Sequence, residues 1–140
     1  MVEFKHKVIS SAGSYRIESP DADAAAMKEM GTLLQEIGSA LGDFFRKGMG
    51  IKESFSVIFD GDGMLSLEKG ALTGVQSQAV RDVLESLNKY LKAEESGEET
   101  EGMLSGKLQG IGEKFVELKE VMDKIHDKSL LPKDGWKFTF

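Results

Sequence analysis

The chain has 140 residues, of which 40% are hydrophobic and 30% are charged, and its formal net charge is -6. This length is enough for a sizeable core, so we expect a single domain over residues 1–140. The acidic balance argues against nucleic acid and anionic membranes as partners, because both attract basic surfaces. The absence of cysteine excludes disulfides, thiol catalysis and thiolate metal sites.

The N-terminal segment predicts a hairpin. Residues 2–10 alternate between apolar and charged or polar side chains, a pattern typical of a half-buried strand. A Ser-Ala-Gly-Ser run at 11–14 predicts a turn, and residues 15–17 a short return strand. No secretory leader is visible, and no apolar run approaches the roughly 20 residues of a membrane span. We therefore expect a cytoplasmic protein with no membrane partner.

The first long helix is expected to begin at Ser19-Pro20 and to end near Arg46. Serine is a favoured helix cap, and proline at the first helical position loses no needed donor. Apolar residues recur along it in steps of three and four: Met27, Met30, Leu34, Ile37, Leu41 and Phe44. This spacing places them on one side of the helix.

Residues 54–68 predict a second hairpin, with its turn at 60–63. The turn sequence, Asp-Gly-Asp-Gly, resembles the centre of an EF-hand calcium loop, and Leu65 fits the apolar eighth loop position. Ile58 and Lys69 fall where that loop needs its first and last carboxylate ligands. We therefore expect a plain turn and no calcium site, since Asp-Gly pairs suit tight hairpin turns.

The C-terminal half predicts two helices and a strand. A helix over 74–93 is followed by residues 94–101, whose five carboxylates predict a flexible acidic loop. A second long helix is expected over 103–128, and a strand over 136–140. The apolar side of the second long helix comprises Leu104, Leu108, Ile111, Phe115, Leu118, Met122 and Ile125.

These elements predict an α+β fold. We expect an antiparallel sheet of about four or five strands, made of two hairpins and the C-terminal strand, packed with three helices, two of them long and amphipathic. Phe44, Phe115, Leu118 and Trp136 lie on apolar faces and should be buried. Glycines at 106, 110 and 112 indicate either tight internal packing or a partner helix packed closely there.

No residue pattern points to catalysis, a cofactor or a metal. The two histidines, His6 and His126, lack the several ligands at tuned spacing that zinc or iron sites need. Ser105 follows Gly102-Met103-Leu104, so it lacks the glycine two places earlier that a nucleophile elbow requires. We therefore expect no catalytic residues, no metal site and no cofactor.

The leading hypothesis for function is a non-enzymatic protein-interaction or assembly module that self-associates as a homodimer. Two helices of about 40 Å would overhang strands of about 20 Å and leave apolar surface for a partner. The candidate interface residues are Met27, Met30, Leu104 and Leu108. The alternatives are a small-ligand or enzymatic domain with a pocket between helices and sheet, and a small acidic chaperone or adaptor.

Overall fold

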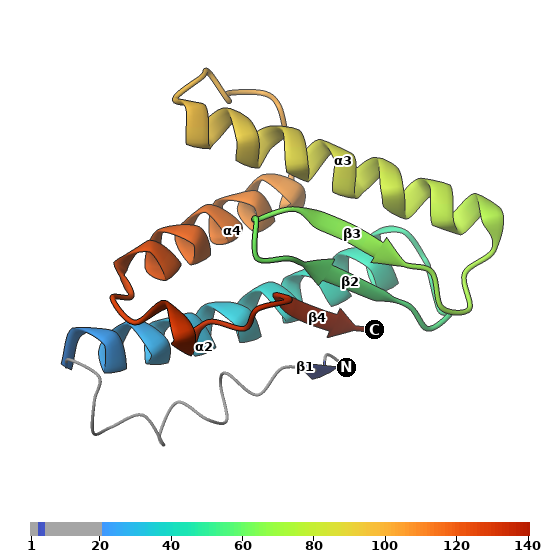
Figure 1. The fold of residues 1–140 in the computed structure, drawn as a ribbon. Helices are drawn as coiled ribbons and strands as arrows, with labels where there is room; N and C mark the ends of the chain where they lie inside the picture. The colour runs from blue at the N-terminus through green and yellow to red at the C-terminus, as the bar shows by residue number, and fades with distance from the viewer. Residues whose placement is uncertain (1–2, 5–20) are drawn as a thin grey trace.

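A computed structural model describes residues 3–4 and 21–140 of the chain (Figure 1). Its helices are α2 (Asp21–Asp43), α3 (Gly74–Ser96) and α4 (Lys107–Lys124), with a π-helical turn η2 (Phe44–Gly48) and a 3-10 turn η3 (Lys128–Leu130). Its strands are β1 (Glu3–Phe4), β2 (Ser56–Phe59), β3 (Leu65–Glu68) and β4 (Trp136–Thr139). No helix among the described residues is long and apolar enough to cross a membrane.

The expected α+β class is confirmed, with fewer full strands than expected. Three antiparallel strands of four residues form the body of the sheet, in the order β4-β2-β3. The two-residue β1 pairs antiparallel with β4 at the far edge. The expected count of four or five strands is therefore too high for the sheet body. The expected return strand at 15–17 and most of the strand at 2–10 lie outside the described residues.

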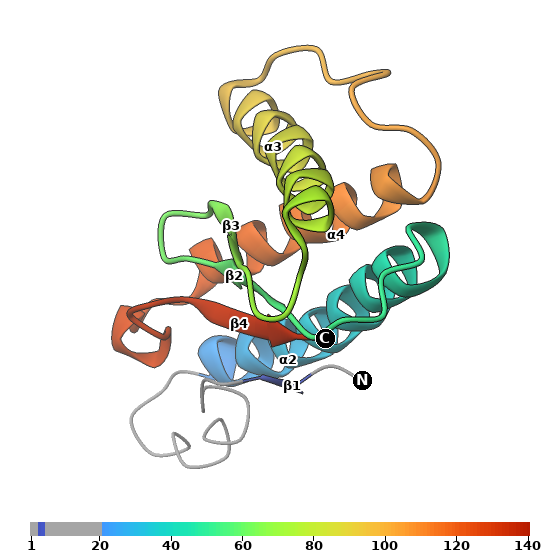
Figure 2. The same ribbon diagram turned by 90° about the vertical axis from the view of Figure 1, so that its right-hand side faces the viewer.

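Helices α2 and α4 lie on one side of the sheet, and α3 lies along its β3 edge (Figure 2). Burial alternates along the strands, because successive side chains point to opposite faces of the sheet. Val57 and Phe59 are fully buried on the helix-covered face. On the other face Ser56 shares a hydrogen bond of 3.2 Å with Thr139, and Lys137 forms an ion pair of 2.9 Å with Glu68 across the strands.

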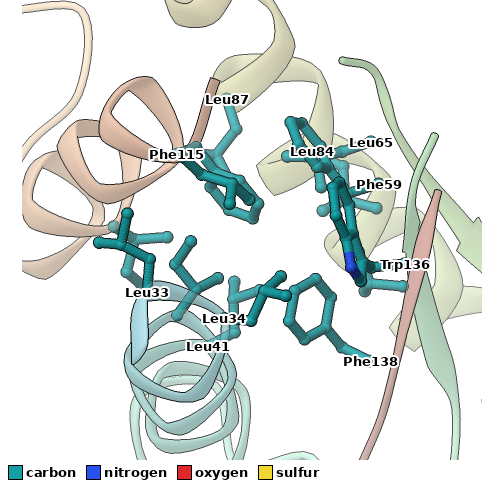
Figure 3. Packing of buried hydrophobic residues seen from close by; sticks show 14 of the residues in the cluster. Leu33, Leu34, Leu41, Phe59, Leu65, Leu84, Leu87, Phe115, Trp136 and Phe138 are labelled. Atoms are coloured by element: carbon teal, nitrogen blue, oxygen red, sulfur yellow. The ribbon is translucent and has the colours of Figure 1, made fainter. Parts of the chain in front are cut away.

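Phe115 lies at the centre of the core (Figure 3). Its ring centroid is 4.9 Å from that of Phe59 and 6.4 Å from that of Phe138, so α4 meets β2 and β4 through aromatic contact. Phe115, Leu118 and Trp136 are at most 1% exposed, which confirms the prediction for these three residues.

The prediction for Phe44 is wrong, because Phe45 takes the buried position. Phe45 is fully buried and Phe44 only partly. Phe45 follows Leu41 by four residues and so continues its side of the helix. The π-helical turn starts here, with the Met49 amide donating to the Phe44 carbonyl at 3.0 Å. The apolar side of this helix therefore ends at Phe45, one residue later than predicted.

The end of α3 lies three residues beyond the predicted one, inside the acidic segment. Gly97 has a φ of 75°, the left-handed conformation that favours glycine. Its amide donates to the Glu94 carbonyl, and the amide of Glu98 donates to the carbonyl of Ala93, which is the Schellman arrangement. Residues 94–96 are therefore helical, and the expected loop at 94–101 begins only at Gly97.

α4 is shorter at both ends than the predicted helix over 103–128. It begins after Gly106, which has a φ of 57°, and it ends before Ile125, whose backbone is extended. Gly112, inside α4, is where Tyr90 and Leu104 pack against the helix. A Cβ at position 112 would lie 2.6 Å from Leu104 Cδ1 and 3.0 Å from Tyr90 Cδ2, so tight internal packing explains this glycine.

Replacing Phe115 by Ala should lower the free energy of unfolding by about 3–5 kcal/mol, as expected for a buried aromatic side chain. Urea denaturation measures this change. Val75→Ala is the control, because Val75 is 83% exposed and should change stability by less than about 0.5 kcal/mol. A loss below about 1 kcal/mol for Phe115→Ala would contradict its central place in the core.

Candidate functional site

Helix α3 lies beside the free edge of the sheet and runs in the opposite direction to β3 (Figures 1 and 2). Asn88 joins the two elements. Its Oδ1 accepts the Leu65 amide at 2.8 Å, and its Nδ2 donates to the Leu65 carbonyl at 2.9 Å. The side-chain amide thus takes the place that a neighbouring strand would occupy at this residue.

The strand geometry explains why Leu65 is the residue that needs Asn88. In an antiparallel pair, alternate residues direct their N–H and C=O toward the partner strand and away from it. Leu65 directs its groups away from β2, toward α3. Unpaired groups at a sheet edge invite pairing with another chain. Asn88 therefore blocks strand addition at Leu65.

A groove with a volume of about 510 Å³ runs between β3 and α3. Its floor is apolar, from Met64, Leu65, Leu67 and Leu84. Met64 is 47% exposed, which makes it one of the most exposed large apolar side chains among the described residues. Leu65 and Leu84 are 4% and 3% exposed, so Met64 provides most of the exposed apolar surface at this groove.

The rim of the groove is basic, although the whole chain is acidic. Arg81, Lys89 and Lys92 line it, together with Glu85. Lys89 is paired with Glu85 at 3.1 Å. Neither Arg81 nor Lys92 has an ion-pair partner within the described part of the chain. Two cations at this rim are therefore available to an acidic partner.

The four predicted interface residues do not lie in this groove. Met27, Met30 and Leu104 are between 1% and 6% exposed, and Leu108 is partly buried against the same core. α2 and α4 pack against each other and the sheet, so little of either apolar stripe overhangs. These residues therefore present almost no free apolar surface while the chain keeps this fold.

A smaller hollow, of about 370 Å³, surrounds Lys119 between α3, α4 and the β2–β3 turn. Lys119 forms an ion pair of 2.8 Å with Glu95. The hydrogen bond from Lys119 and its charge hold the pKa of Glu95 below its ordinary value. The described residues contain no group of three or more His, Asp or Glu side chains placed to hold a metal ion.

The predicted turn at 60–63 is confirmed, and its first aspartate builds it. Asp60 Oδ1 accepts the amides of Asp62 and Met64 at 2.9 and 3.0 Å. Its own amide donates to the Met64 carbonyl. This carboxylate stabilises the turn through the backbone, as aspartate often does.

Asp23 is a buried carboxylate whose role the sequence did not reveal. It is fully buried near the start of α2 and accepts the amides of His126 and Asp127 at 2.8 and 3.0 Å. The His126 ring, largely exposed, lies 3.0 Å away through Nδ1. Because these amides face Asp23, they are not available to continue α4, which explains the early end of that helix.

The hydrogen bond from the His126 amide is the largest cause that lowers the pKa of Asp23 below its ordinary value, against the opposing effect of burial. The contacts between Asp23 and His126 orient the imidazole ring and hold the loop after α4 against the start of α2. No local pattern connects residues that are 103 positions apart, so the sequence alone does not reveal this contact.

No family model, no curated protein and no solved structure matches this chain.

Asp23→Asn should lower the melting temperature at neutral pH, because an amide cannot accept both backbone N–H groups as well as a carboxylate does. Since folding lowers the pKa of Asp23, its contribution is present above the unfolded value of about 3.9 and is lost as the pH falls through the folded pKa. The difference between wild type and variant should therefore narrow below about pH 4.

Thermal melts between pH 7 and pH 2.5 test this expectation. Asp134→Asn, at an exposed position, is the control and should change the melting temperature little at any pH. A gap between wild type and Asp23→Asn that stays constant down to the lowest pH would show that the charge of Asp23 contributes nothing.

Proposed function

We propose that this chain is a non-enzymatic protein-interaction module that self-associates, with the groove between α3 and β3 as its contact surface. One observation supports this most: the exposed Met64 lies in an apolar groove with a basic rim, on a chain of net charge -6. A second copy carries more acidic than basic side chains, 24 Asp and Glu against 18 Lys and Arg, and so can offer carboxylates to that rim. Complementary charge steers such encounters and favours the correct partner.

The groove suits a protein segment better than a small ligand. Small-ligand sites combine an apolar cavity with a few convergent polar groups that fix orientation. Here the central amide, Asn88, is already engaged by Leu65 through both of its polar atoms. The other polar groups are charged side chains along the rim. Met64 adds a flexible side chain that adapts to a partner surface.

A homodimer with two-fold symmetry is the simplest assembly of this kind. A two-fold interface repeats each contact, so the groove of each subunit receives the same acidic part of its partner. The Asn88 contact also bears on this assembly. It closes the β3 edge at Leu65, which favours side-chain docking in the groove over continuous strand addition between subunits.

Met64→Glu should weaken self-association at least about tenfold, which corresponds to about 1.4 kcal/mol, because it places a charge in the apolar floor. Sedimentation velocity over a wide concentration range measures this effect. Val75→Glu is the matched control: Val75 is also an exposed apolar residue, but it lies outside the groove lining.

The proposal predicts that wild type and Val75→Glu show the same dimer dissociation constant, with Met64→Glu shifted toward monomer at an unchanged melting temperature. A wild-type chain that remains monomeric at high micromolar concentration would contradict it. Equal weakening by both substitutions would place the contact elsewhere.

A further inference from the structure

We propose that residues 98–103 of one copy occupy the α3–β3 groove of the other, an inference that rests on the proposed self-association. This acidic segment connects α3 to α4. It contains Glu98, Glu99, Glu101 and Met103, all exposed. It joins three carboxylates to one apolar side chain, the chemistry that a basic-rimmed apolar groove would recognise.

The charges of the two surfaces are complementary. None of the three carboxylates has an ion-pair partner among the residues the structure describes. Across the proposed contact they meet Arg81 and Lys92, the two rim cations without an ion-pair partner among the described residues. The local contact would thus join opposite charges, although two copies of net charge -6 repel each other at long range.

Met103 supplies the apolar part of the contact. It is 40% exposed, and Met64 in the groove floor is 47% exposed. Burying both removes two of the large apolar side chains that the described part of the chain leaves in solvent. Such central apolar anchors with a charged rim are typical of protein interfaces.

The directions of the elements allow both contacts to form at once. A two-fold axis perpendicular to α3 sets the two copies of this helix antiparallel. The C-terminal end of one α3, which leads into residues 98–103, then lies beside the preceding turns of the other. Each copy contributes one groove and one acidic segment, so a dimer holds two identical contacts.

The segment presents its side chains from a turn. The Met103 amide donates to the Thr100 carbonyl at 3.1 Å, and Gly102 has a φ of 83°. The rim residues span 81–92 of α3, or about 17 Å of helix at 1.5 Å per residue, so a turn of this kind contacts part of the groove. The start of this segment is anchored by the turn at Gly97 and by Thr100 Oγ1, which donates to Glu94 Oε2 at 2.6 Å.

Reciprocal charge reversal tests this contact. The groove variant is Arg81→Glu with Lys92→Glu, which leaves Asn88 and the Lys89–Glu85 pair intact. The segment variant is Glu98→Lys with Glu99→Lys and Glu101→Lys. Each variant alone has a groove and a segment of the same sign, so each should be monomeric, with a dissociation constant at least about tenfold above wild type.

An equimolar mixture of the two variants should dimerise again. In the mixed dimer the acidic groove meets the basic segment, and the basic groove meets the acidic segment, so both contacts are attractive. Sedimentation velocity of each variant and of the mixture gives the readout, and circular dichroism melts confirm folding. Lys52→Glu with Lys133→Glu, two exposed lysines outside the groove, is the control and should dimerise like wild type.

The outcomes distinguish the occupation of the groove by residues 98–103 from self-association itself. Monomeric variants with a dimeric mixture would support the segment-in-groove contact. Folded variants that remain dimeric alone, or that stay monomeric when mixed, would overturn it. If Met64→Glu still disrupts self-association in that case, the proposed function stands, and another part of the second copy occupies the groove. A monomeric wild type would overturn both proposals.

Discussion

The two hydrogen bonds between Asn88 and Leu65 are the contact on which the candidate site depends. A three-stranded sheet body with helices on one side still has an edge at β3. Asn88 satisfies the backbone of that edge at one residue and holds α3 alongside it. The same contact creates the groove, because a helix fastened beside a strand leaves a channel between their side chains.

Electrostatics divides this surface into two parts of opposite sign. Arg81, Lys89 and Lys92 lie along the groove, and the acidic segment follows directly at the end of the same helix. Both parts are exposed, so contacts between them are screened by salt over a Debye length of about 10 Å at 0.1 M. Association through them should therefore weaken as ionic strength rises, whereas the aromatic core around Phe115 should respond far less.

Local patterns predicted most of the fold. The turn at 60–63, the three helices and the C-terminal strand follow from Asp-Gly chemistry and from apolar spacing, which act over a few residues. The errors at the helix ends have different causes. The end of α4 depends on a distant contact with Asp23, whereas the end of α3 depends on a local one, the left-handed conformation of Gly97.

The candidate site was largely invisible in the sequence for a related reason. Asn88 is a polar residue in a helix, and nothing nearby in sequence shows that it will meet Leu65, 23 positions earlier. Met27 and Met30 were predicted as interface residues because periodicity places them on an apolar stripe but does not say what covers it. Here α4 and the sheet cover it, and the exposed apolar surface lies at Met64 instead.

The most direct test of the central claim, that the groove and the acidic segment form the contact, is amide hydrogen exchange at low and high protein concentration. We expect slower exchange at high concentration in residues 64–67 and 98–103, with no change at the exposed positions 127–129 and 133–134. Concentration-dependent protection confined to any other part of the chain, or the same exchange at both concentrations, would contradict it.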